Sequence, residues 1–231
     1  MTVPGAVRVA TWNLQWAGTR SAASGEIHRR LDLVDPDVAV LTEARMSILD
    51  GWPARAHAGL ACYPGMPADG AKVAIVSRVT LAVIDHHPAD ELMAHNFLAV
   101  DVAAPSGPLR VIGVVVRYRQ ISAFIDQLPE ALDRTVVPGR TVLAGDFNLR
   151  VPGGPQSSRL LEVLTDFELK VRSGRHHPVL DAERPLIDHI AVSDALSTDE
   201  LQVWPRRHPN YRGGNAETTD HAGCAITVHL T

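Results

Sequence analysis

The stretch with the clearest chemical potential is Gly145-Asp146-Phe147-Asn148, which follows the apolar run 141–144. Asp146 and Asn148 are two residues apart, and in extended backbone residues at this spacing point to the same side. A carboxylate beside a carboxamide, at the carboxyl end of a buried strand, suits a hard metal ion, a water molecule to be activated and a phosphoryl oxygen. The alternative is a strand that ends in an ordinary polar turn, because Gly, Asp and Asn are common turn residues.

Polar residues interrupt apolar segments at four further places, which we expect to lie at or near the carboxyl ends of strands. They are Asn13 in Thr11–Trp16, Glu43 in Leu41–Ala44, Asp188 in Ile187–Ile190, and Asp220 with His221 before the last apolar segment. Each has an ordinary explanation when taken alone, as a turn, a loop start or a partner for a surface arginine. If the residues do not form one site, each of them needs its own ordinary explanation, and all of these explanations must be true at once.

The remaining sequence predicts the elements that position these side chains. Segments rich in Val and Ile predict strands over 7–12, 38–41, 72–77, 80–84, 97–102, 109–116, 141–144, 187–192, 200–203 and 222–230. The turn 105–108 predicts that its two flanking strands pair as a hairpin. The first strand, helix and second strand follow within a short span, which indicates a sheet covered by helices.

Three helices are expected, over 22–33, 121–137 and 157–164. Pro129 should break or kink the second, and Ser157 or Ser158 should cap the third. Proline and glycine are spread along the chain and do not concentrate in a linker. We therefore expect one domain, residues 1–231, in which two sheets pack on each other under helices.

The composition is that of an ordinary globular protein, with 231 residues, 45% of them hydrophobic, and a net charge of -4. Proteins that grip long nucleic acids usually show a basic excess, which is absent here. Two local basic clusters occur, and such clusters are usually solvated surface. They are Arg206, Arg207, His208 and Arg212, and Arg117 with Arg119.

The sequence contains few features that indicate a disulfide framework, a zinc site or a targeting segment. One disulfide between Cys62 and Cys224 stays open, but no paired-cysteine spacing supports a zinc site. The start of the chain lacks the features of a signal peptide, and no apolar run approaches the ~20 residues that span a bilayer. A cytoplasmic protein is expected. The abundance of Ala, Val, Pro and Arg is typical of a GC-rich bacterial genome.

In their order and spacing, these motifs resemble the endonuclease/exonuclease/phosphatase superfamily, which includes deoxyribonuclease I-like and exonuclease III-like enzymes. The resemblance runs from about Val7 to Leu230, and Gly70–Arg78 also looks like a strand of this family. It implies an α/β (α+β) fold, a four-layer α/β/β/α sandwich of two mostly antiparallel sheets. It also implies hydrolysis of a phosphate ester with Mg²⁺ or Mn²⁺ as cofactor.

The resemblance further implies roles on the metal side. Glu43 looks like the principal metal carboxylate, Asn13 lies beside it, and Asp220 looks like a further acid there. Mg²⁺ prefers oxygen ligands and keeps several waters, so one or two carboxylates suffice.

On the catalytic side, Asp146 would orient or deprotonate the attacking water, and Asn148 would hold a phosphoryl oxygen or the nucleophile. His221, oriented by Asp188, would contact the phosphoryl group or act as general acid or base. Phosphoryl transfer needs this combination of charge neutralisation and an in-line oxygen nucleophile.

The chain departs from the family at Arg117-Tyr118-Arg119. Many members have a His or Tyr that contacts the scissile phosphate at this strand end. Arg117 could clamp a phosphate but cannot donate a proton at working pH, whereas a shift of one residue would bring Tyr118 inward. Both residues stay candidates for substrate binding.

The substrate expected from these features is a small, exposed phosphodiester: a nucleic-acid end, a short oligonucleotide or a small phosphodiester metabolite. Among these, the expected activity is that of a nuclease. One alternative is a phosphatase or a sphingomyelinase-like phosphodiesterase on a small or lipid substrate. Another is a non-catalytic binding module on the same fold. Neither stable membrane association nor an obligatory protein partner is expected.

Overall fold

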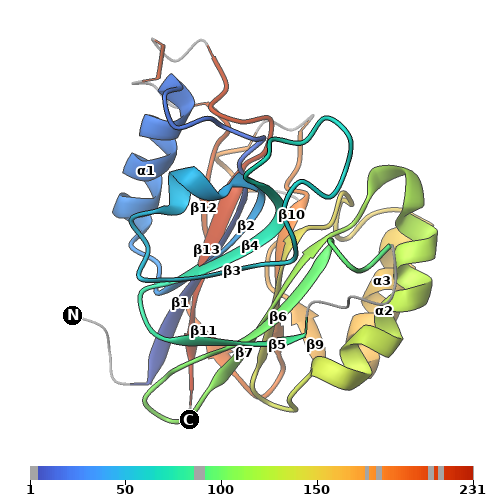
Figure 1. The fold of residues 1–231 in the computed structure, drawn as a ribbon. Helices are drawn as coiled ribbons and strands as arrows, with labels where there is room; N and C mark the ends of the chain where they lie inside the picture. Colours follow the sequence, from blue (N-terminus) through green and yellow to red (C-terminus); the bar gives the residue numbers. More distant parts are fainter. Residues whose placement is uncertain are drawn as a thin grey trace.

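Two β-sheets pack face to face, with helices on both outer sides (Figure 1). This computed structural model describes residues 5–85, 92–174, 177–180, 184–207, 211–212 and 216–230. Three hydrophobic clusters fill the layers: one between the sheets, one under the first helix and one under the other two. The architecture is therefore the expected four-layer α/β/β/α sandwich.

The first sheet has seven strands. In order they are β11 (Ser197–Thr198), β13 (Gly223–His229), β1 (Ala6–Asn13), β2 (Val38–Arg45), β4 (Gly70–Ser77) and β3 (Ala54–His57), with β12 (Gln202–Trp204) also paired to β13. β1 and β2 are parallel and are joined by α1 (Ala22–Val34), whose residues Ile27, Leu31 and Val34 pack on this sheet. The other pairs in this sheet are antiparallel.

The second sheet has six strands, and only β7 and β8 run parallel in it. Its order is β5 (Leu81–Asp85), β6 (Phe97–Val102), β7 (Leu109–Val115), β8 (Thr141–Asp146), β10 (Asp188–Ser193) and β9 (Leu169–Val171). Its outer face is covered by α2 (Ile121–Thr135) and α3 (Pro155–Asp166). Two short 3₁₀ helices, η1 (Met46–Leu49) and η2 (Tyr118–Gln120), follow β2 and β7.

Strand β7 shows how the sequence divides its side chains between the layers. Val111 and Val115 point to the inter-sheet core, while Ile112 and Val114 point to the helices, as the two-residue period of a strand requires. Gly113 lies where the sheets approach most closely. A Cβ atom there would lie 2.6 Å from Val73 Cγ1 in the opposite sheet, so this position has no room for a side chain.

Most expected elements are confirmed, including the hairpin of β6 and β7. The expectation that Pro129 interrupts the second helix is wrong. α2 continues through Pro129, because its buried stripe, which includes Phe124 and Leu128, packs on the second sheet and offsets the lost hydrogen bond. Among the described residues, the sequence failed to predict the short strands β3, β9 and β11.

The cap expected at Ser157 or Ser158 is also wrong. α3 begins at Pro155 with Gly154 as its N-cap, so both serines lie inside the helix. Proline fits the first helical position because its fixed φ suits the helix and its missing N–H would have no helical partner there.

The five polar motifs gather at one rim of the sandwich, although only three of them lie at or near strand carboxyl ends. Asn13, Glu43 and Asp146 lie at or near the ends of β1, β2 and β8. Asp188 instead begins β10, and His221 precedes β13. These two strands run antiparallel to β8 and β1, so their beginnings reach the rim where the other strands end.

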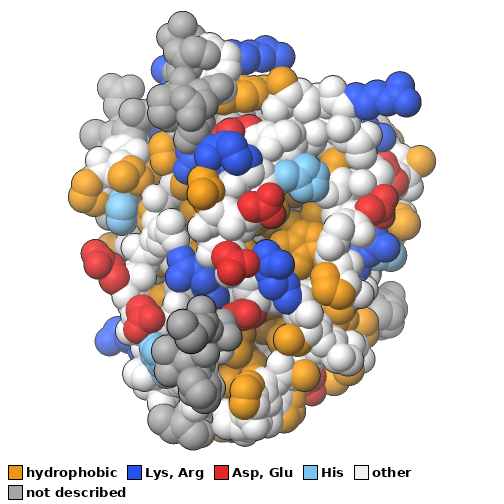
Figure 2. Space-filling view, turned by 90° about the vertical axis from the view of Figure 1, so that its left-hand side faces the viewer, with side chains coloured by type: hydrophobic (Ala, Val, Ile, Leu, Met, Phe, Trp, Pro, Cys, Tyr) orange, Lys and Arg blue, Asp and Glu red, His pale blue; other side chains and the backbone are white. Residues whose placement is uncertain are grey.

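The face that carries α1 mixes charges of both signs. Figure 2 shows Lys and Arg side chains interspersed with Asp and Glu among the described residues of this face, without a continuous basic field. Within the described part of the chain, none of the helices combines the length and apolarity needed to cross a membrane.

The close approach of the sheets yields a stability prediction. Gly113→Ala should lower the free energy of unfolding by about 1–3 kcal/mol, because a methyl group there overpacks the core between the sheets. Gly25→Ala is a matched control in α1, where an added Cβ meets nothing within 4 Å, and it should raise stability by up to about 1 kcal/mol. Urea denaturation measures both variants, and an unchanged midpoint for Gly113→Ala would contradict the packing described here.

Candidate active site

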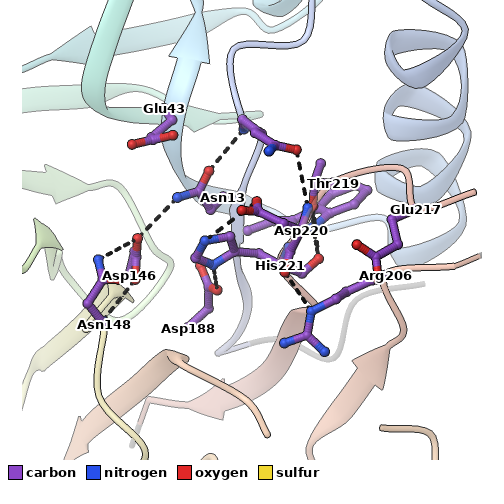
Figure 3. Close-up of polar contacts among 12 residues, drawn as sticks. Asn13, Glu43, Asp146, Asn148, Asp188, Arg206, Glu217, Thr219, Asp220 and His221 are labelled. Carbon is purple, nitrogen blue, oxygen red and sulfur yellow. Dashed lines mark hydrogen bonds and ion pairs between the residues drawn. The ribbon is translucent and has the colours of Figure 1, made fainter. Parts of the chain in front are cut away.

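A cavity of about 630 Å³ opens at this rim, between the ends of strands from both sheets. All but one of the residues expected at the site line it. They are Asn13, Glu43, Arg117, Tyr118, Asp146, Asn148, Asp220 and His221. The exception is Asp188, which is fully buried and bonded to the ring of His221 (Figure 3).

Asp146 is held at the base of the cavity by the backbone of β8. The preceding residue, Gly145, has a φ of +144°, and a Cβ atom there would lie 2.0 Å from the Val114 carbonyl oxygen. Only glycine fits this position, so the glycine of the motif sets the direction of the carboxylate. The Nδ2 atom of Asn13 donates to Asp146 Oδ2 at 3.1 Å.

Asn148 does not share an extended strand with Asp146, as its two-residue spacing had suggested. It has a φ of +48°, and its backbone N–H donates to Asp146 Oδ1 at 2.9 Å. Its Nδ2 donates both to Asp146 Oδ2 at 3.0 Å and to the Val116 carbonyl at 2.9 Å. Both amide hydrogens are thus engaged, which leaves Oδ1, an acceptor, for any ligand.

His221 lies between two carboxylates (Figure 3). Its Nδ1 contacts Asp188 Oδ2 at 2.6 Å, and its Nε2 lies 3.7 Å from Asp220 Oδ1. The indole of Trp12 donates to the His221 carbonyl at 3.1 Å and thereby fixes the loop before β13. Nε2 is therefore the nitrogen that can face a ligand in the cavity.

The pKa values of this cluster depart from their ordinary ranges. Burial, followed by the charge of Asp188, raises the pKa of Asp146 to about 7, although His221 and hydrogen bonds from Asn148 and Asn13 oppose the rise. Burial alone would lower the pKa of His221, but Asp188, Asp146 and Asp220 raise it to about 10. At neutral pH His221 is therefore a cation and a donor, while Asp146 is close to its midpoint.

Glu43 is paired with a cation that the sequence analysis did not single out. Lys72 Nζ lies 2.5 Å from Glu43 Oε1, and also 5.2 Å from the ring centre of Trp16. Lys72 lies on β4, a strand of mostly apolar residues. A charged residue in such a strand is the feature of the sequence that could have indicated a role for Lys72 at the site. Glu43 itself has a φ of +47°.

Arg117 and Tyr118 both line the cavity, but they differ in position. Arg117 follows Val115 by two residues in extended backbone, and its guanidinium lies 4.4 Å from the ring centre of Tyr63. Tyr118 is 76% exposed at the edge of the cavity. Arg117 therefore occupies the inward position that the strand register assigns.

The expectation of a solvated basic cluster is wrong for Arg206, which is only 6% exposed. Its guanidinium donates to the carbonyls of Asp220 at 2.6 Å and Arg184 at 2.9 Å. It therefore connects the loops that precede β13 and β10, the two loops that carry His221 and Asp188. Arg207 is exposed as expected, and His208 lies outside the described residues.

The disulfide that the sequence left open between Cys62 and Cys224 is not formed. Cys62 and Cys224 are both free thiols, and Cys224 is buried in β13.

Two groups of side chains could hold a cation. Asp146, Asp188 and His221 have ligand atoms within 4.8 Å of one another. In the metal-free protein the ring of His221 is protonated, so a cation bound by this group would have to displace that proton, because a metal ligand must be neutral imidazole. The carboxylates of Glu43 and Asp220 face the cavity, and Glu43 already attracts the ammonium of Lys72, so the oxygen donors on this side fit a hard divalent ion better.

The structure thus combines a two-sheet α/β sandwich with a carboxylate–histidine cluster at one rim. A model of the Endonuclease/Exonuclease/phosphatase family matches residues 10–221, and the chain therefore belongs to that family. The endonucleases, exonucleases and phosphatases in the family name are enzymes of phosphoester bonds. A search of curated protein sequences finds no match.

Solved structures share the fold at low sequence identity. The endonuclease domain of TRAS1, a telomere-specific non-LTR retrotransposon, aligns with a TM-score of 0.71 and 15% identity over 97% of this chain and 99% of that one. D. rerio TDP2 complexed with a single-strand DNA product gives 0.69 and 15%, over 97% and 99%. The 3′ phosphatase NExo from Neisseria, bound to a product DNA hairpin, gives 0.62 and 20%, also over 97% and 99%.

The cluster yields a titration prediction. In metal-free protein the imidazole of His221 should titrate near pH 10, and Asp188→Asn should lower that pKa because the Asp188 carboxylate is the strongest of the groups that raise it. An unfolded histidine loses its proton near 6.5, so the ion pair stabilises the fold fully below that pH. This stabilisation is lost as the pH rises through about 10. NMR titration of the ring protons measures the pKa directly.

Asp199→Asn serves as the control. Asp199 pairs with the more exposed His229, at the far end of β13, at 2.7 Å, so its removal should leave the titration of His221 unchanged. An equal pKa for His221 in the wild type and in Asp188→Asn would show that the ion pair does not control this proton.

Proposed function

We propose that this protein is a divalent-metal-dependent phosphodiesterase, and specifically a nuclease that acts on short or single-stranded ends. The observation that carries the proposal is the buried contact of Asp188 with His221 beside Asp146, at the rim of a fold shared with the family. Titratable groups whose pKa values are pushed apart in one cavity are typical of acid–base catalysis.

The cation would be held on the side of Glu43 and Asp220, with Asn13 adjacent. Mg²⁺ or Mn²⁺ bound there would neutralise charge that develops on the phosphoryl oxygens. For this to happen, Glu43 must exchange its contact with Lys72 for the incoming ion. The freed ammonium of Lys72 would remain in the cavity as a further cation.

Asp146 is the proposed base. Its pKa of about 7 lets it accept a proton from water near neutral pH, and the contacts from Asn13 and Asn148 fix its orientation. Asn148 would hold the same water through Oδ1, because its amide hydrogens are already engaged. An acceptor binds the O–H of a water molecule and not an unprotonated phosphoryl oxygen, so the nucleophile is its proposed partner.

His221 is the proposed acid. Protonated at neutral pH, it would donate from Nε2 to a phosphoryl oxygen or to the leaving oxygen, while Asp188 fixes Nδ1 and with it the tautomer. Arg117 would bind a phosphate oxygen by its charge, because an arginine does not release its proton at working pH. Acid catalysis by His221 is thus consistent with the absence of a titrating residue at position 117.

A short or single-stranded substrate suits the surface better than a long duplex. The net charge is -4, and the face in Figure 2 mixes both signs, whereas long duplexes are gripped by extended basic surfaces. Structural neighbours in complex with a single-strand DNA product and with a DNA hairpin product support nucleic acid as the substrate class.

The residue roles predict a loss of turnover. Asp146→Asn and His221→Ala should each lower kcat/KM by about 10²-fold or more while the fold is retained, because each removes a proton-transfer group. Hydrolysis of bis-p-nitrophenyl phosphate, plasmid and single-stranded DNA, with Mg²⁺, Mn²⁺ or EDTA, measures the effect. Circular dichroism checks the fold.

His229→Ala is the matched control. His229 lies at the end of β13 away from the cavity and pairs with Asp199, so its loss should leave turnover unchanged. Near-wild-type activity of either site variant would refute the assignment. Faster hydrolysis of p-nitrophenyl phosphate than of the diesters would indicate a phosphatase. A folded protein that hydrolyses none of the substrates with any of the metals would indicate a binding module.

The contact between Lys72 and Glu43 predicts a change in metal affinity. Lys72→Met should bind Mn²⁺ and Mg²⁺ about two- to fivefold more tightly, because no ammonium then competes for the Glu43 carboxylate. Calorimetry measures the affinity without turnover. In the wild type, fluorescence of Trp16 should change on metal addition as Lys72 leaves its ring.

Lys170→Met provides the control, since Lys170 is exposed on β9 and does not line the cavity. It should bind metal like the wild type. Unchanged or weaker binding in Lys72→Met would mean that Glu43 is not the residue that receives the cation.

A further inference from the structure

A second cavity of about 620 Å³ adjoins the catalytic one, and we call it the side cavity. Arg117 and Gln120 line both cavities and therefore lie between them. Tyr63, His95 and Gln127 line only the side cavity. Nothing in the proposed chemistry uses these three residues.

One wall of the side cavity is aromatic and cationic. The guanidinium of Arg117 lies 4.4 Å from the ring centre of Tyr63, and the ring of His95 meets Tyr63 edge-on at 5.9 Å. The Tyr63 hydroxyl accepts a hydrogen bond from Asn96 Nδ2 at 3.0 Å, and Asn96 is fully buried. The wall is thus fixed in place. Flat surfaces of tyrosine and arginine are the surfaces on which unpaired bases stack.

The other walls carry amide groups. Gln120 precedes α2 and Gln127 lies within it. The Oε1 atom of Gln127 is buried and has no hydrogen-bond partner within the part of the chain described here. A buried acceptor without a partner is unfavourable, so a rotation of the Gln127 side chain that turns Oε1 toward an N–H donor in the cavity would be favoured. The edge of a nucleobase supplies such donors, and glutamine amides pair with them.

The chemistry of the side cavity disfavours other ligands. Arg117 is the only Lys or Arg among its described lining residues, which is too little charge for a second phosphate or a polyphosphate. The two glutamines and His95 make it too polar for a lipid chain. A planar heterocycle with N–H groups, attached to a phosphate bound in the catalytic cavity, satisfies both walls at once.

We infer that the side cavity binds the base of the nucleotide next to the scissile phosphate, with Arg117 between base and phosphate. This inference rests on the proposed phosphodiesterase function and makes its substrate a nucleotide ester. It assigns to Tyr63 and Gln127 the recognition of a nucleobase.

The kinetic test compares esters that share a leaving group. Thymidine 5′- and 3′-(p-nitrophenyl phosphate) carry a base, and methyl p-nitrophenyl phosphate does not. The wild type should prefer at least one thymidine ester by about tenfold or more in kcat/KM. Tyr63→Ala and Gln127→Leu should each abolish most of this preference while turnover of the methyl ester is retained. Gln156→Leu, on the exposed side of α3, should keep the preference.

The binding test does not depend on turnover. In the Asp146→Asn background, calorimetry should show that deoxynucleoside 5′-monophosphates bind about tenfold more tightly than 2-deoxyribose 5-phosphate, and that Gln127→Leu removes the difference. Failure to hydrolyse any ester would defeat the proposed function, and the binding test would still decide on the base site. Hydrolysis with a base preference that survives both variants, or with no preference at all, would overturn the side-cavity inference alone.

Discussion

The site depends on one pairing between neighbouring strands of the second sheet. In the antiparallel register of β8 and β10, Asp146 and Asp188 are direct partners, and both are buried. Burial, and after it the repulsion from the neighbouring carboxylate of Asp188, raises the pKa of Asp146. The ring of His221 supplies the compensating charge through its 2.6 Å contact with Asp188. The raised pKa values of Asp146 and His221 therefore both depend on the backbone register that places Asp188 beside Asp146.

The rest of the fold positions His221 next to Asp146 and Asp188. His221 comes from the other sheet, immediately before β13, and β13 is antiparallel to β1. Trp12 at the end of β1 donates to the His221 carbonyl, and Arg206 binds the carbonyl of the preceding residue. Packing of the two sheets, tight enough to exclude a side chain at Gly113, is what brings the two halves of the cluster together.

The order of the polar motifs carried the family resemblance from which the sandwich was predicted. Eight of the expected site residues line one cavity of the structure. What the sequence could not provide were interactions set by tertiary contacts. The burial of Arg206 depends on three carbonyls from distant loops. The pairing of Lys72 with Glu43 depends on the register of β2 with β4, and the continuity of α2 through Pro129 depends on packing against the second sheet. Local patterns do not contain this information.

The departure at Arg117 connects the charge balance of the site to its choice of substrate. The cationic side chains of the catalytic cavity, Lys72, Arg117, Arg119 and His221, are matched by Glu43, Asp146, Asp220 and the adjoining Asp188. Without the proposed cation, a balanced cavity attracts a phosphate anion weakly, so binding energy must come from the cation and from uncharged parts of the substrate. Arg117 stacks on Tyr63 and also lines the side cavity. Contacts between the side cavity and an uncharged part of the substrate would therefore form next to the bound phosphate. In the proposed function, a permanently charged residue at this position would therefore serve recognition and not proton transfer.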